Sequence, residues 1–327
     1  MKGGAVAQED EARRARRRLV LLALRAAVSL LLIGLLFLRA NVREIWSAMR
    51  QAEAGPLAAA FALLFVGYII STLRWQFLLR ALEIHLPFRS LLASYCVAIF
   101  VGNFLPSTVG GDAVRAYDTV RLSGRKGAPI AAVLVDRLLG VLALVLFAAL
   151  VVVGGAKGEV ALPWLRVGIL LGLVAVVALV VWIFAGRKEA GGEVDPPLSG
   201  AQRGLAGLAR RSIAAFRAFG GKTSALGMGI GYSLLLQANV VLHFYLIAKA
   251  VGINLGIGHF FFVVPVATLL TMLPISINGI GIRENAFVFL LSPFGVPPST
   301  TIAFTWIGFG MILLYGAMGG VVYALRR

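Results

Sequence analysis

Long apolar segments recur along this chain, and they constrain its fold more than any other feature. The hydrocarbon core of a bilayer is roughly 30 Å thick, so a helix needs about 20 apolar residues to cross it. Segments of about that length or longer are residues 19–38, 57–79, 129–153, 163–185, 224–250 and 300–325. Backbone groups in lipid must find their hydrogen bonds inside their own segment, so each segment should be helical. We therefore expect an all-α integral membrane protein with about six full spans.

Charged residues are scarce and unevenly placed. They make up 14% of the chain, which carries a formal net charge of +17. Lys and Arg gather between the apolar segments, as they do in the cytoplasmic loops of membrane proteins. We therefore expect no nucleic-acid partner. Cys96 is the single cysteine, and neither metal-ligand spacing nor a nucleotide-binding motif occurs. We expect no metal, no cofactor and no group of catalytic residues.

Two further apolar segments are too short for a full span. Residues 90–105 are followed by Pro106, and residues 259–273 are followed by Pro274. Each holds about 15 residues, or roughly 23 Å of helix, and then continues through Gly and polar residues into a second helical segment. Interrupted segments of this kind are typical of re-entrant helices around a transport site. The sequence predicts two helical hairpins with their breaks at Pro106 and Pro274.

The sequences at the two breaks resemble each other. Residues 105–115 read LPSTVGGDAVR, and residues 273–283 read LPISINGIGIR. If both segments are re-entrant, most Lys and Arg fall on the cytoplasmic side, whereas full crossings would divide them almost equally. Three full spans separate the two hairpins, so the hairpins should insert from opposite faces of the membrane. We expect an inverted repeat whose hairpin tips meet near the midplane.

This topology divides the chain into few parts. A basic cytoplasmic tail should cover residues 1–18, and one membrane domain should cover residues 19–327. The repeat halves within that domain should be about residues 19–153 and 163–327. The basic loop 186–222 and both termini should lie on the cytoplasmic side of a multi-pass protein.

Arg115 and Arg283 occupy equivalent positions after the two breaks. Free N–H groups at the start of a helix, together with hydroxyls and an Arg, suit a phosphate or a carboxylate. We expect the head group of a substrate to bind there. The predicted binding residues are Ser107, Thr108, Gly110, Gly111, Arg115, Ser276, Asn278, Gly279 and Arg283.

Other charged residues fall at membrane depth, where each costs about 2.5–3.5 kcal/mol on insertion scales. Candidates for gating or charge pairing are Arg74, Asp112, Asp136, Arg137 and Glu284. The adjacent residues Asp136 and Arg137 point about 100° apart on a helix, so they should face different partners. The alternative to anion binding is that Arg115 and Arg283 pair internally with these carboxylates and hold the hairpins together.

Four segments carry a resemblance to a known family. They read LRWQFLL at residues 73–79, NFLPSTVGGDAVRAY at 103–117, VDRLLG at 135–140 and LPISINGIGIRENAF at 273–287. In this order they resemble the flippase-like transmembrane domain of bacterial lysylphosphatidylglycerol synthases and its stand-alone relatives. The resemblance implies a location in the bacterial cytoplasmic membrane and movement of a phospholipid between leaflets. A separate soluble domain makes the aminoacylated lipid in the synthases, and we expect no such activity here.

We therefore expect ATP-independent translocation of an anionic or phosphate-bearing lipid, which could be a phospholipid, a glycolipid or a polyprenyl-linked molecule. Two other function classes stay open. One is a membrane-embedded transferase in which Asp112, Asp136 or Glu284 is a general base toward a lipid-linked donor. The other is a non-catalytic partner of an enzyme that makes envelope lipids. A homodimer is one assembly that we consider.

Overall fold

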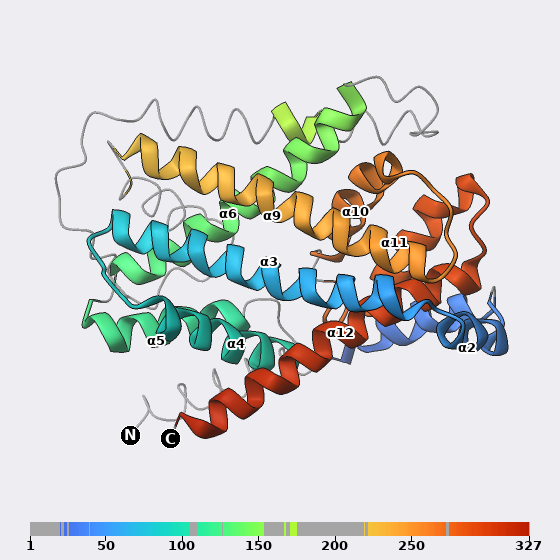
Figure 1. The fold of residues 1–327 in the computed structure, drawn as a ribbon, viewed down its shortest axis with the longest axis horizontal. Coiled ribbons are helices and arrows are strands. Elements are labelled where there is room, and N and C mark those ends of the chain that lie inside the picture. The colour runs from blue at the N-terminus through green and yellow to red at the C-terminus, as the bar shows by residue number, and fades with distance from the viewer. Residues whose placement is uncertain are drawn as a thin grey trace, which may run out of the picture.

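The computed structural model describes residues 20, 23–24, 26–38, 40–104, 110–125, 127–153, 167, 171–174, 219, 222–272 and 275–326. All regular secondary structure in these ranges is helical (Figure 1). Several predicted features lie outside the described residues: Pro106, Ser107, Thr108, Pro274, the tail 1–18, most of the span 163–185 and nearly all of the loop 186–222.

Four of the expected spans appear as long apolar helices. They are α3 (Ala54–Ala81), α6 (Gly127–Val153), α9 (Thr223–Ala250) and α12 (Pro298–Leu325). A fifth candidate is the helix Ala26–Phe37 together with α2 (Val42–Arg50), two helices that meet at a bend of 84°. The described residues therefore form four apolar spans, or five with the bent pair, as in a multi-pass membrane protein.

The two short apolar segments are short helices, as expected. They are α4 (Phe88–Phe104) and α10 (Ile257–Thr271). Each is followed by a break and then by a second short helix, α5 (Gly110–Ser123) or α11 (Ile282–Leu291). The 3₁₀ turn η1 (Ser292–Phe294) ends the second unit.

The α4–α5 unit begins and ends at the same end of the long helices. At this end the Lys222 ammonium donates to the carbonyl of Ala81, which joins the start of α9 to the end of α3. Nη1 of Arg125, just after α5, donates at 2.9 Å to the carbonyl of Leu82, in the connection from α3 to α4. We call this end of the molecule the Leu82 end.

The α10–α11 unit begins and ends at the opposite end. There the Glu53 N–H donates to the carbonyl of Ala250 at 2.9 Å, so the start of α3 adjoins the end of α9. The His259 ring, at the start of α10, lies edge-on to the Phe294 ring, after α11, with centroids 4.8 Å apart. We call this the Glu53 end. The two broken units therefore start from opposite ends of the same bundle.

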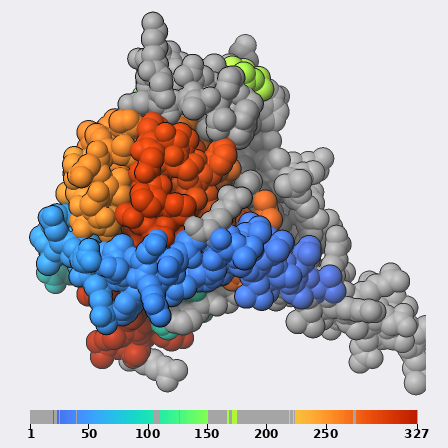
Figure 2. Space-filling view, turned by 90° about the vertical axis from the view of Figure 1, so that its right-hand side faces the viewer, coloured from blue at the N-terminus to red at the C-terminus, as the bar shows by residue number. Residues whose placement is uncertain are grey.

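The N-terminal and C-terminal parts of the chain pack together at the Glu53 end. Figure 2 shows the blue N-terminal residues running across the orange and red C-terminal ones. Ser299 at the start of α12 donates from Oγ to the Glu44 carboxylate of α2 at 2.7 Å. Ile45 of α2 is 1% exposed and packs in a cluster with Ile302 and Ala303 of α12. This packing fixes the start of α12, whose middle reaches the site described next.

Candidate functional site

One cavity of about 360 Å³ lies where the two breaks come together. We call it the tip cavity, and its lining is Tyr68, Tyr95, Ala98, Ile99, Gly102, Asn103, Gly111, Asp112, Arg137, Asn278 and Ile312. The first break contributes Gly111 and Asp112, and the second contributes Asn278. Tyr68 and Ile312 stand close to the middle of α3 and α12, so the cavity lies halfway along the spans.

The second break is built from left-handed backbone. Asn278 has a φ of 52°, Gly279 of 74° and Gly281 of 85°. Asn and Gly tolerate this region better than other residues do. A Cβ on Gly281 would lie 2.8 Å from the Leu32 Cβ, so this glycine also lets the helix Ala26–Phe37 approach. The Asn–Gly pair in the sequence thus corresponds to an unusual local backbone.

The first break uses its glycines differently. Gly110 and Gly111 are the first residues of α5 and are helical. A Cβ on Gly111 would lie 2.8 Å from the carbonyl oxygen of Ala98, which is on α4. Gly111 therefore lets α5 pack closely against α4, and it also lines the tip cavity. Because α5 begins at Gly110, Arg115 lies on its second turn.

Charged side chains form a continuous chain beside the tip cavity. The carboxylate of Asp136, which is 3% exposed, accepts from Arg74 Nε at 2.6 Å and from Arg115 Nη2 at 3.0 Å. Arg115 Nη1 lies 3.6 Å from Asp112 Oδ1, and Arg137 donates to the other oxygen of Asp112. We call these five residues the charge chain. Asp136 faces α3 and α5, whereas Arg137 faces the cavity, as adjacent helix positions must.

The buried half of the charge chain is held firmly. Arg74 Nη1 donates to Ser233 Oγ on α9 at 2.8 Å. The Arg115 guanidinium lies over the rings of Trp75 and Tyr95, at 4.3 Å and 5.0 Å from their centroids. Stacking on aromatic faces and bonding to a carboxylate suit a guanidinium removed from water. Arg115 is therefore engaged by its neighbours, while Asp112 and Arg137 line the cavity.

The charge chain carries a surplus positive charge. Counted over the described residues, it holds three guanidinium groups, from Arg74, Arg115 and Arg137, and two carboxylates, from Asp112 and Asp136. The formal sum is +1. A single negative charge entering the tip cavity would neutralise it.

Arg283 lies behind the second break. Its Nη2 donates to the carbonyl of Asn278 at 3.1 Å, and its guanidinium lies 4.6 Å from the Phe309 ring centroid. Arg283 Nη1 and Ser276 Oγ are both buried, and neither has a hydrogen-bond partner among the described residues. Buried donors of this kind are rare in folded proteins and call for an explanation such as an absent ion or ligand.

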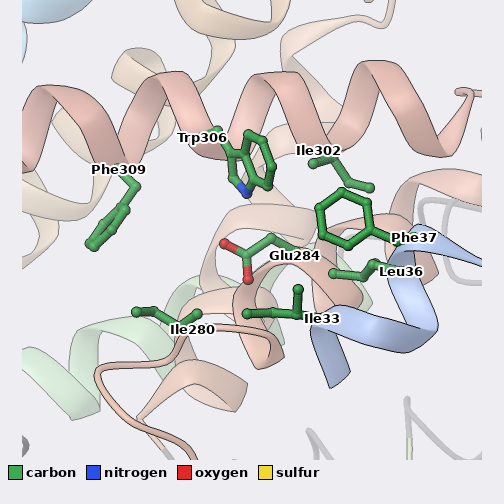
Figure 3. Close-up of a pocket in the computed structure, with 8 residues that line it drawn as sticks. All are labelled: Ile33, Leu36, Phe37, Ile280, Glu284, Ile302, Trp306 and Phe309. Atoms are coloured by element: carbon green, nitrogen blue, oxygen red, sulfur yellow. The ribbon is translucent and has the colours of Figure 1, made fainter. Parts of the chain in front are cut away.

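Glu284 lines a second, more apolar cavity of about 250 Å³, shown in Figure 3. We call it the Glu284 pocket, and its other lining residues are Ile33, Leu36, Phe37, Ile280, Ile302, Trp306 and Phe309. The sequence alternative paired Glu284 with Arg283. The carboxylate instead accepts from the Gly281 N–H at 2.7 Å and caps the start of α11. Within the described residues, no group of three or more His, Cys, Asp and Glu side chains could hold a metal ion.

The structure brings half of the predicted binding and charge-pairing residues to one place. Asp112, Arg137, Gly111 and Asn278 line the tip cavity, with the rest of the charge chain directly behind. Three polar lining residues were not predicted, namely Tyr68, Tyr95 and Asn103. Asn103 opens the NFLP segment and could have been noticed from its place before the break. Nothing in the sequence singles out the two tyrosines.

Comparisons with known proteins agree with a membrane protein. The model of the family described as the lysylphosphatidylglycerol synthase TM region matches residues 22–319. Two proteins of Methanothermobacter thermautotrophicus, each named UPF0104 membrane protein, are 27% and 26% identical to this chain. The first alignment covers 88% of this chain and 92% of the relative, and the second covers 88% and 87%. Glycosyltransferase AglD of Haloferax volcanii is 25% identical, over 84% of this chain and 49% of that protein.

Proposed function

This chain belongs to the family of the lysylphosphatidylglycerol synthase TM region, and from that premise we propose that it moves an anionic, phosphate-bearing lipid between membrane leaflets without ATP. The observation that carries the proposal is the tip cavity, which both breaks line and which adjoins a charge chain of formal charge +1. A cavity halfway along the spans suits a head group in transit, because a charge is most costly there without a partner.

In this proposal α4–α5 and α10–α11 are re-entrant hairpins that enter from opposite faces. The bond from Arg125 to Leu82 and the contact of His259 with Phe294 support it, because each closes one unit at its own end. Hairpins inserted from opposite faces, with tips that meet at the midplane, form the inverted repeat used for alternating access. Small rocking of either hairpin would then open the tip cavity to one leaflet at a time.

The charge distribution supports one orientation in the membrane. The Leu82 end carries Arg80, Arg89, Arg125, Lys222 and Arg326. Cytoplasmic segments of membrane proteins are enriched in Lys and Arg. The Leu82 end is therefore assigned to the cytoplasm, and the Glu53 end to the opposite side.

The head group binds by exchange with Asp112. Without substrate, Asp112 pairs with Arg137 and stands near Arg115. An entering phosphate takes the place of Asp112 on Arg137, since both are oxygen anions that accept charge-assisted hydrogen bonds. Arg283 Nη1 and Ser276 Oγ, which have no hydrogen-bond partner in the described part of the chain, form the next binding site for the same anion.

A membrane-embedded transferase is the second candidate, because one relative is named a glycosyltransferase. Asp112 would then be the general base toward a lipid-linked donor. Arg115 and Arg137 already contact the two oxygens of this carboxylate, which leaves less of it free to approach a substrate hydroxyl. The relative is also about twice the length of the aligned region. Translocation therefore remains the better supported function.

The test uses the purified chain in liposomes. Phosphatidylglycerol and an isoprenyl phosphate, each with a fluorescent label, report the leaflet through an impermeant quencher. The wild-type chain should move at least one of the two anionic lipids, and Arg137→Ala and Arg283→Ala should slow it about tenfold or more, the effect of one lost charge-assisted bond. Arg43→Ala, an exposed change on α2, is the matched control. Lipid that is chemically converted would support the transferase, and a stable complex without either activity would support a partner of a biosynthetic enzyme.

A further inference from the structure

The tip cavity contains neutral polar groups that an anion alone leaves unexplained. Its lining includes the phenols of Tyr68 and Tyr95 and the side-chain amides of Asn103 and Asn278. Among the described residues, no hydrogen bond engages either phenol or the Asn278 amide. Asn103 Nδ2 donates to the Ile312 carbonyl at 3.4 Å, and this bond leaves the amide oxygen of Asn103 unused. These groups are therefore available to a ligand.

The mixture of donors and acceptors indicates what kind of ligand fits. Phosphate oxygens of a lipid diester only accept hydrogen bonds, so they cannot use the amide oxygens of Asn103 and Asn278 or the Asp112 carboxylate. A hydroxyl both donates and accepts, and amides and phenols can serve it in either role. A cavity lined by Arg137, a carboxylate, two amides and two phenols therefore matches hydroxyl groups next to a phosphate.

The tyrosine rings favour a cyclic polyol over a small acyclic one. The Tyr68 and Tyr95 rings are 5.9 Å apart and tilted by 47°. Tyr315 packs edge-on against Tyr68 at 5.4 Å, and Arg115 lies over Tyr95, so both rings are held in place before a ligand binds. The ring of a tyrosine gives apolar contact area next to its polar hydroxyl. The C–H faces of a pyranose ring are apolar and can pack against such a ring.

The volume of the tip cavity agrees with this size of ligand. At about 360 Å³ the cavity lies near the lower end of small-molecule sites. A phosphate group alone would leave most of that space to water, whereas one hexose attached to a phosphate is of the right order.

We propose that the lipid moved by this chain carries a glycosyl phosphate head group, with the phosphate on Arg137 and the sugar between Tyr68, Tyr95 and the two asparagines. This inference rests on the proposed function and names its substrate class. Asp112, once displaced from Arg137, accepts from a sugar hydroxyl.

The experiment measures binding to the full-length chain in detergent with four soluble probes: farnesyl phosphate, farnesyl phosphoglycerol, farnesyl phosphomannose and farnesyl phosphoglucose. At least one sugar probe should bind about tenfold tighter than farnesyl phosphate, the effect of one or two net hydrogen bonds. Tyr68→Leu and Asn278→Gly should erase the advantage of the sugar probes over farnesyl phosphate, and the thermal unfolding midpoints of the variants show whether they are folded. Glycine is chosen at Asn278 because φ is positive there. Tyr117→Leu, at a 66% exposed position of α5, is the control.

The outcomes separate the two proposals. Equal affinity for farnesyl phosphate and both sugar probes would overturn the sugar assignment and leave anion transport intact. Equal affinity for phosphoglycerol and the sugar probes would overturn it in favour of an acyclic polyol. Failure of all four probes to bind would contradict the proposed function itself, because the anion site is common to them.

Discussion

Asp136 is the residue on which the charge chain depends. It is almost fully buried and accepts from both Arg74 and Arg115. Removal of one partner from a buried ion pair leaves an uncompensated charge and costs about 3–5 kcal/mol. Asp136→Ala should therefore lower the thermal unfolding midpoint strongly in detergent, whereas Glu53→Gln, an exposed carboxylate, should leave it unchanged. An unfolding midpoint of Asp136→Ala equal to that of the wild type would contradict the charge chain.

Loss of the Asp112 carboxylate should strengthen the binding of substrate. If it competes with the substrate for Arg137, its neutralisation should strengthen binding. Asp112→Asn should bind farnesyl phosphate about tenfold more tightly and release it more slowly, so that translocation falls although affinity rises. Affinity titration and the leaflet assay measure the two effects separately. Weaker binding by Asp112→Asn would show that the carboxylate does not compete.

Sequence reasoning at this scale located the charged residues around the tip cavity but did not separate those that line it from those buried behind it. Both breaks were identified from apolar segments too short to span, and the members of the charge chain were identified from their place after a break or from their charge at membrane depth. Arg115 was expected to bind the substrate, yet it is buried against Asp136, and Arg137 lines the cavity. The two arginines look alike in the sequence, because only packing decides which guanidinium reaches the cavity. Tyr68 and Tyr95 were not predicted for the same reason, because only packing shows that their rings line the cavity.

Helix packing between α4 and α12 positions the first hairpin. A Cβ on Gly319 of α12 would collide with the carbonyl oxygen of Cys96 on α4, and backbone cannot move aside as a flexible side chain can. Gly319→Ala should push α4 away and destabilise the protein by about 1–3 kcal/mol, as overpacking does. Gly310→Ala, on the same helix with open space around it, is the matched control. Unfolding midpoints in detergent compare the two, and equal midpoints would contradict the packing.

Elements were easier to predict than sites. Hydrophobic length located α3, α6, α9 and α12, because the bilayer requires about 20 residues per span. The short segments 90–105 and 259–273 agree closely with α4 and α10. The bend between Ala26–Phe37 and α2 was not predicted, since the polar residues that follow the apolar segment indicate where a helix ends but not its direction afterwards.

Whole-molecule topology is tested by labelling from either side. In a Cys96→Ser background, single cysteines at His85 and Arg125 flank α4–α5, and those at Asn254 and Ser292 flank α10–α11; all four positions are exposed. Impermeant thiol reagents should label the first pair from the cytoplasmic side and the second pair from the other side. Labelling of the two members of a pair from different sides would contradict the hairpin.

The central claim is that the head group crosses between the two breaks, and cross-linking tests it most directly. Gly102→Cys and Asn278→Cys would place one thiol on each side of the tip cavity in a Cys96→Ser background. With the leaflet assay as readout, a short reducible bifunctional thiol reagent should stop translocation of the anionic lipid, and reduction should restore it. Either single-cysteine variant should stay active with the same reagent. Undiminished translocation by the cross-linked protein would contradict the account.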